Sequence, residues 1–211
     1  MFLVEYFGPI LITLLLIIFQ KEIYGKESEY TLNQKLGIFM VLLHYVKREF
    51  ETVLVHRFSN DTMPFMNIFK NSTHYWLFFG VFNMYFFLHP LYTPPTWATD
   101  TFFIGSTVLF CIFEFLNLQC HLVLKNLRKP GTTERGVPQG WGFSYVSCAN
   151  YFWEALAWLT FAVQSQVIGA YFFLAVSFFQ MLQWALYKHN RYKKDFPKYP
   201  KGRKAMVPFV I

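Results

Sequence analysis

Residues 167–186 read VIGAYFFLAVSFFQMLQWAL and contain no charged side chain. A helix needs roughly 20 predominantly apolar residues to cross the hydrocarbon core of a bilayer, so this stretch is long enough by itself. Apolar runs with few charges also occupy residues 75–88, 101–118 and 151–163, and residues 1–19 contain the run LITLLLII at 11–18. Residues 32–58 are the least apolar candidate. The pattern predicts an all-α, polytopic membrane protein with about six transmembrane helices.

The composition agrees with this prediction. Of the 211 residues, 55% are hydrophobic and 22% aromatic, which is more apolar surface than one soluble core of this size would bury. Residues 1–19 can alternatively be interpreted as a signal peptide, but they lack a basic start and a small-residue cleavage site, so we take them as the first span. We treat residues 1–211 as one domain: the first span and loop at 1–31, spans two and three at 32–98, spans four to six at 99–187, and a basic tail at 188–211.

The net charge of +7 is distributed unevenly. Lys and Arg gather between spans two and three, between spans four and five, and in the tail, whereas residues 89–100 and 164–166 contain neither. The loop at 20–32 breaks the contrast, although acidic residues offset its two lysines. The positive-inside rule therefore predicts that both termini are cytosolic. In a membrane protein such a tail attracts anionic lipid headgroups, and we expect no nucleic-acid partner.

Metal chemistry is not expected. The six histidines contain no HxxxH pair, which argues against a membrane di-iron centre. The three cysteines form no CxxC pair and are expected to be free thiols.

The second segment carries ionisable residues at membrane depth, where each costs several kcal/mol unless it is paired or faces water. Tyr45 and Arg48 share one helix face, while Lys47 and Glu51 share another with His44. The segment can be a helix in the interface, or Lys47 and Glu51 can satisfy each other at i,i+4. Two polar faces on one helix otherwise suggest protein contacts on both sides.

Three other segments carry polar residues at one end. Asn117, His121 and Arg128 lie on one face at the end of segment four and offer donors to phosphate, carboxamide or ribose groups. Segment five begins with Asn150, which can be a simple helix cap, and Tyr151 and Glu154 follow one turn apart. Segment six ends with Lys188, His189 and Tyr192. A carboxylate one turn inside a span indicates a polar chamber, and Tyr151 is a plausible proton donor within it.

Several of these residues belong to longer motifs, which are His44-Tyr45-x-x-Arg48, Leu127-Arg128-Lys129-Pro130-Gly131, Pro138-Gln139-Gly140, Ser147-x-Ala149-Asn150-Tyr151-x-x-Glu154, Lys188-His189-x-x-Tyr192 and Tyr199-Pro200-Lys201-x-Arg203-Lys204-Ala205. Together they resemble the steroid 5α-reductase superfamily over nearly the whole chain. His121 and the stretches His56-Arg57-Phe58-Ser59, Asn67-Ile68-Phe69-Lys70-Asn71 and His89-Pro90-Leu91-Tyr92 resemble its very-long-chain trans-2-enoyl-CoA reductase branch. Members of this branch usually carry a ubiquitin-like domain ahead of the first span, and this sequence begins at that span.

The resemblance implies a bundle like that of the steroid 5α-reductases and a multi-pass protein of the endoplasmic reticulum. It implies NADPH-dependent reduction of a trans-2-enoyl-CoA to the saturated acyl-CoA, at the end of the very-long-chain fatty acid elongation cycle and beside other enzymes of that cycle. The implied catalytic residues are Tyr151, Tyr45, Glu154 and Lys47. The implied NADPH contacts are Asn117, His121, Arg128, Asn150, Lys188, His189 and Tyr192.

Two alternatives stay open at this point. The same chemistry can reduce a steroid or polyprenol enone, and the chain can be a non-catalytic membrane scaffold. The sequence also leaves open which of Tyr45 and Tyr151 donates the proton. On a regular helix Lys47 and Tyr45 lie on opposed faces, so a direct pair between them is not expected.

Overall fold

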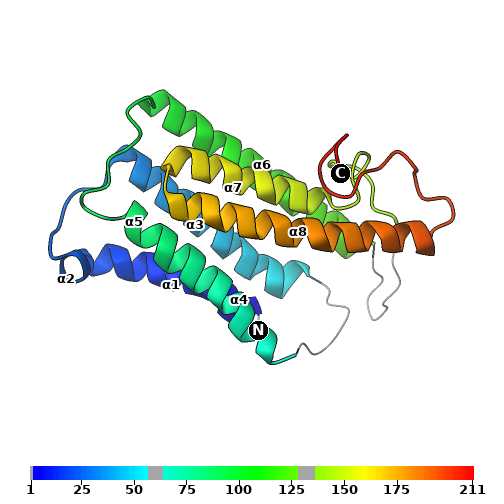
Figure 1. Cartoon of the computed structure of the whole chain (residues 1–211), viewed down its shortest axis with the longest axis horizontal. Helices are drawn as coiled ribbons and strands as arrows, with labels where there is room; N and C mark the ends of the chain where they lie inside the picture. Colours follow the sequence, from blue (N-terminus) through cyan, green and yellow to red (C-terminus); the bar gives the residue numbers. More distant parts are fainter. Residues whose placement is uncertain (1, 57–63, 128–135) are drawn as a thin grey trace.

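The computed structural model describes residues 2–56, 64–127 and 136–211 (Figure 1). Their helices are α1 (Phe2–Ile18), α2 (Gln20–Tyr24), α3 (Leu32–Phe50), η1 (Glu51–Val55), α4 (Met66–Ser72), η2 (Thr73–Met84), α5 (Tyr85–Phe87), α6 (Asp100–Asn126), α7 (Ala149–Ser165) and α8 (Ile168–Asp195). These residues contain no β-strand, only an isolated bridge between Val146 and Lys204. The predicted all-α class is confirmed.

Local sequence signals explain where two of the long helices begin. At α3 the Gln34 N–H donates to the Thr31 hydroxyl, and the Thr31 N–H donates to the Gln34 side chain, which completes a capping box. At α6 the Thr99 hydroxyl accepts from the Phe102 N–H. Both caps satisfy backbone donors that the first helical turn leaves unpaired.

Two segments are π-helical, which the sequence did not predict. The element η1 continues α3 at its C-terminal end, and η2 joins α4 to α5 so that helical structure runs unbroken from residue 66 to residue 87. The third segment is therefore longer than the apolar run at 75–88. A π-helix changes the hydrogen-bond register without changing which residues are apolar, so the sequence pattern does not reveal it.

The helices pack side by side along the long axis of the molecule (Figure 1). α6 packs along α7, α3 lies against α1 and α6, and η2 contacts both α1 and α8. Their shared core is aromatic, with Tyr45, Phe79 and Trp158 in mutual ring contact. At Gly169 the α8 backbone comes so close to η2 that an added Cβ would stand 2.6 Å from the Phe82 carbonyl oxygen.

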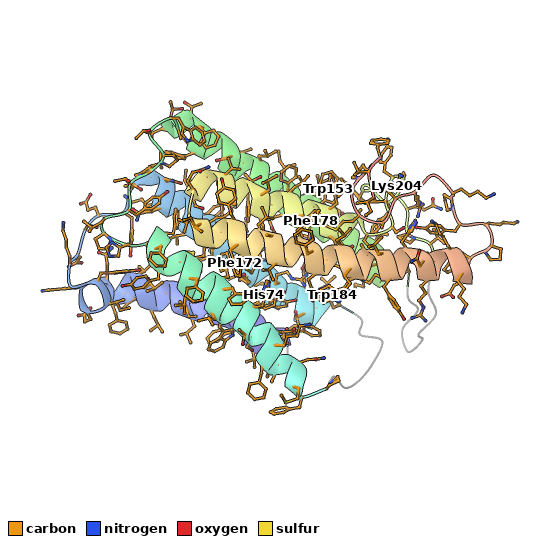
Figure 2. The ribbon with its side chains drawn as sticks, viewed as in Figure 1. His74, Trp153, Phe172, Phe178, Trp184 and Lys204 are labelled. Atoms are coloured by element: carbon orange, nitrogen blue, oxygen red, sulfur yellow. The ribbon has the colours of Figure 1, made fainter. Side chains whose placement is uncertain are left out.

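Within the described residues, α6 and α8 are long and apolar enough to cross a membrane, and α1 is a shorter apolar helix. Apolar side chains also cover much of the outer surface, as Figure 2 shows for Phe172 and Trp184 on α8, which are 49% and 48% exposed. All six expected segments are helical, but among the described residues only α6 and α8 have both the length and the hydropathy of a membrane span. The count of six spans stays a prediction.

The C-terminal segment is folded rather than a free basic tail. Its first residues, 188–195, continue α8. Further on, the Ser147 N–H donates to the Lys204 carbonyl and the Lys204 N–H donates to the Tyr145 carbonyl. Arg203 is only 7% exposed and donates to the Pro138 carbonyl at 3.0 Å. Lys204 thus lies at the same end of the bundle as Trp153 near the start of α7 (Figure 2). The interpretation as a lipid-attracting surface does not account for these backbone contacts.

Candidate functional site

A cavity of about 360 Å³ lies where one end of each long helix meets the others. Its wall combines the start of α1, the end of α3 with η1, the end of α6, the start of α7 and the end of α8. A volume of this size is within the usual range of small-molecule sites. The lining residues that bear on the chemistry are Tyr6, Arg48, His56, His121, Lys125, Ser147, Cys148, Asn150, Tyr151, Glu154, Lys188 and Tyr192.

One wall carries Tyr151, Glu154 and Lys188. Tyr151 and Glu154 lie one turn apart at the start of α7, which directs both toward the cavity. The Lys188 ammonium, near the end of α8, donates to the Tyr151 hydroxyl oxygen at 2.7 Å. The wall therefore combines a phenol, a carboxylate and an ammonium group.

Arg48 and His121, which also line the cavity, belong to an ion-pair network around Glu51. Its carboxylate lies 2.9 Å from His121 Nδ1 and 3.0 Å from Arg48 Nη1. Arg48 also donates to the Tyr6 hydroxyl at 2.7 Å, and its guanidinium lies over the Tyr6 ring. These contacts join η1 to α6 and α3 to α1. They hold the Arg48 guanidinium at the cavity wall. Its buried Nε atom has no hydrogen-bond partner among the described residues.

Glu51, His56 and His121 lie close enough together to suggest a metal site, with their ligand atoms within 4.8 Å. Two cations already occupy the surroundings. Arg48 Nη1 is 3.4 Å from His56 Nε2, and Lys47 Nζ is 3.6 Å from Glu51. Positive charge at these distances repels a metal ion, so we do not assign a metal site to Glu51, His56 and His121.

Lys47 points away from the cavity, into the contact between α3 and α6. Its ammonium lies 2.8 Å from the Glu114 carboxylate and donates to the Asn117 side chain. The other oxygen of Glu114 is 2.8 Å from His44 Nδ1. Both polar faces of α3 thus contact protein, as the sequence suggested. The expected i,i+4 pair of Lys47 and Glu51 is present at 3.6 Å, and Lys47 has its partners on α6 in addition.

Asn117 connects this ion-pair cluster to the start of α7. Its side-chain N–H donates to the Asn150 carbonyl at 2.9 Å. Asn150 itself is not the cap of α7, because that position belongs to Cys148. The capping interpretation of Asn150 is therefore wrong. Its side chain is available at the cavity wall instead.

Tyr45 is fully buried and does not line the cavity. Its ring lies against His44, Phe79 and Trp158. The Tyr45 hydroxyl has no hydrogen-bond partner among the described residues. The two tyrosines that the sequence could not separate thus have different surroundings.

His189 does not line the cavity itself but contacts Ser147, which does. The Ser147 hydroxyl, which lines the cavity, contacts His189 Nδ1 at 2.5 Å and the Tyr199 hydroxyl at 2.6 Å. The Tyr199 ring stacks on Tyr192. The C-terminal segment therefore supports the wall that α8 and the loop before α7 form.

The structure brings most of the expected site residues to one place. His121, Asn150, Tyr151, Glu154, Lys188 and Tyr192 line the cavity, while Asn117 and His189 stand directly behind lining groups. Lys47 and Tyr45 face the core, and Arg128 lies outside the described residues. Glu114 and Tyr6 were not among the residues expected from the sequence. A carboxylate inside the apolar run 101–118 was a usable signal for Glu114, but Tyr6 gave none.

Comparison with known proteins gives a consistent result. Residues 61–211 match the family described as 3-oxo-5-alpha-steroid 4-dehydrogenase. The whole chain is 41% identical to a "Very-long-chain enoyl-CoA reductase" of Dictyostelium discoideum, covering 69% of that protein. It is 42% identical to the "Probable very-long-chain enoyl-CoA reductase art-1" of Caenorhabditis elegans, covering 70%. The mouse "3-oxo-5-alpha-steroid 4-dehydrogenase 2" is 32% identical over 85% of this chain and 68% of its own length. The resemblance inferred from the motifs is confirmed.

Proposed function

Because the chain belongs to the 3-oxo-5-alpha-steroid 4-dehydrogenase family, we propose that it is an oxidoreductase that converts trans-2-enoyl-CoA to saturated acyl-CoA, the last step of very-long-chain fatty acid elongation. The names of its relatives from Dictyostelium and Caenorhabditis support this substrate over a steroid. The observation that carries the proposal is the cavity in which Tyr151, Glu154, His121 and Arg48 meet from three helices.

NADPH is the cofactor that suits these residues. When bound, it would supply the hydride that Cβ of the enoyl group must gain. The cavity offers what such a ligand needs, namely the cationic side chains of Arg48 and Lys188 and the amide of Asn150. His121, Asn150 and Tyr192 would contact the cofactor directly, with Asn117 and His189 supporting them from behind; Arg128 and Lys188 are proposed as cofactor contacts on the resemblance alone.

Tyr151 is the proton donor in this proposal. Reduction at Cβ leaves an enolate, with negative charge on the thioester oxygen and at Cα, and Cα must then gain a proton. Preorganised donors near that oxygen lower the barrier because they are aimed at charge that develops only during the reaction. The Tyr151 hydroxyl is at the cavity wall, and Glu154 one turn along α7 helps to orient the reacting groups. Tyr45 remains the second candidate.

Lys47 has a supporting role in this scheme. Because its ammonium is engaged by Glu114 and Asn117, it acts through Asn117, which donates to the carbonyl of the residue before Tyr151. The charge on Lys47 thus helps to set the position of the first turn of α7.

We further propose that the chain is a six-span protein of the endoplasmic reticulum membrane with both termini in the cytosol. The absence of Lys and Arg from the connections at 89–99 and 166–167 supports this orientation. The cavity end would then face the compartment in which NADPH and acyl-CoA are dissolved. The acyl chain would contact membrane lipid, and other enzymes of the elongation cycle would be neighbours.

The test is a substrate comparison with the purified protein in nanodiscs. NADPH oxidation is followed with a trans-2-enoyl-CoA and, separately, with a steroid enone, and the products are identified by mass spectrometry. We expect saturated acyl-CoA and little reduction of the steroid. Turnover of the steroid alone would favour the activity named for the mouse relative. If the protein shows neither turnover nor NADPH binding, a non-catalytic scaffold is favoured instead.

A further inference from the structure

The contact between Lys188 and Tyr151 joins two elements whose residues are far apart in sequence. Tyr151 lies in the first turn of α7 and Lys188 two turns before the end of α8. Besides donating to the hydroxyl at 2.7 Å, the ammonium lies 4.6 Å from the centroid of the Tyr151 ring. Both side chains line the cavity. The Lys188 ammonium is therefore held against the Tyr151 side chain by both a hydrogen bond and a ring contact.

Lys188 also lacks the partner that a partly buried lysine usually has. Within residues 2–56, 64–127 and 136–211 no carboxylate lies within ion-pair distance of its ammonium. Lys47, the other lysine associated with the site, is held by Glu114, Asn117 and Glu51. Of the two, only Lys188 has its charge directed at a group that can react.

We propose that Lys188 is the positioning residue of the proton donor Tyr151, an inference that rests on the proposed function. Its N–H occupies one lone pair of the phenol oxygen, which leaves the O–H directed into the cavity. In the step itself the Tyr151 O–H bond breaks, its proton joins the enolate electron pair to form the new Cα–H bond, and a phenolate remains. The Lys188 charge stabilises that phenolate. The phenolate recovers a proton from water, and Lys188 keeps its own protons throughout.

This role differs measurably from the cofactor contact that the family resemblance implies for Lys188. A residue that only holds the cofactor changes the Kd for NADPH. A residue that acts through Tyr151 changes kcat and leaves that Kd unchanged. Its effect also disappears when the Tyr151 hydroxyl is absent, because two residues acting as a unit are not additive.

The experiment compares Lys188→Met, Lys188→Arg, Tyr151→Phe and the double variant Lys188→Met with Tyr151→Phe in the full-length protein in nanodiscs. Lys194→Met is the matched control, since Lys194 is an exposed lysine on the same helix. For Lys188→Met we expect kcat for trans-2-enoyl-CoA to fall roughly 100-fold, the lower end of the contribution of a general acid. Lys188→Arg should recover part of this loss, and the double variant should be no slower than Tyr151→Phe.

Three results would overturn the inference: a raised NADPH Kd with kcat unchanged, losses that multiply in the double variant, or full activity in Lys188→Met. If Lys188→Met does not fold, as judged by size-exclusion chromatography and thermal unfolding, Lys188→Gln is used with the same criteria. An unmodified protein that does not reduce enoyl-CoA at all would instead contradict the proposed function.

Discussion

Tyr45 and Tyr151 both carry a hydroxyl that could donate a proton, and their surroundings separate them. The Tyr45 ring is enclosed by aromatic side chains, whereas Tyr151 lines the cavity and accepts a hydrogen bond from Lys188. A general acid must be within reach of the atom that it protonates. This geometry favours Tyr151, even though the sequence motifs include both residues.

We predict that Tyr151→Phe lowers kcat roughly 100-fold or more, because the proton donor is lost while ring packing is kept. NADPH binding, measured by fluorescence titration, should stay close to that of the unmodified protein. Tyr45→Phe is the control and should keep most of the activity. If Tyr45→Phe is the slower of the two, Tyr45 is the donor.

A second prediction concerns the contribution of Glu114 to stability. Its two oxygens bind His44 and Lys47, and all three side chains lie within the contact between α3 and α6. We expect Glu114→Gln to lower the free energy of unfolding by about 3 kcal/mol, because it leaves a buried cation short of its partner. Chemical denaturation of the variant and of the unmodified protein in mixed micelles measures this difference in the free energy of unfolding.

The matched control for Glu114→Gln is Asp195→Asn, which removes the exposed i,i+4 partner of Arg191. An exposed pair contributes about 0.5 kcal/mol or less. Equal stability of the two variants would contradict the structural role given to Glu114.

At the scale of elements, small residues decide how closely helices approach. α8 meets η2 at Gly169, where the Phe82 carbonyl and the Asn83 Cα leave no room for a side chain. Gly105 on α6 has no atom within 4 Å of its Cβ position. The same residue type therefore has a packing function in one helix and none in the other.

We predict opposite effects for the same substitution at these two positions. Gly169→Ala should lower stability by about 1–3 kcal/mol, because the atoms in the way belong to the backbone and overpacking forces the helices apart. Gly105→Ala should be neutral or stabilising by up to about 1 kcal/mol, because alanine favours the helix. Thermal unfolding of both variants in detergent measures the difference. A loss at Gly105 as large as that at Gly169 would contradict the packing described for α8 and η2.

At the scale of the whole molecule, the sequence predicted the helices well but not the contacts between them. Apolar runs located all the long helices, and polar stripes on three of them located six residues that line the cavity. The partner of Tyr151 could not be predicted, because Lys188 is 37 residues away and the pairing depends on how α7 and α8 are rotated. The π-helical register of η2 could not be predicted either, because it leaves the pattern of apolar residues unchanged.

The proposed topology makes a further prediction. In sealed endoplasmic-reticulum vesicles, external protease should remove a tag at the C-terminus and spare one inserted between Pro94 and Pro95. The physical reason is that the basic segments stay on the cytosolic side while the connection at 89–99 carries no positive charge. Digestion of both tags would contradict six spans with this orientation.

In the proposed reaction, the protein adds a hydride from NADPH to Cβ of an enoyl-CoA and a solvent-derived proton to Cα. Isotope tracing with the unmodified protein tests this most directly, using NADPH deuterated at the transferable position in ordinary water and unlabelled NADPH in heavy water. We expect deuterium at Cβ in the first product and at Cα in the second. Saturated product without deuterium at Cβ in the first experiment, or no saturated product in either, would contradict it.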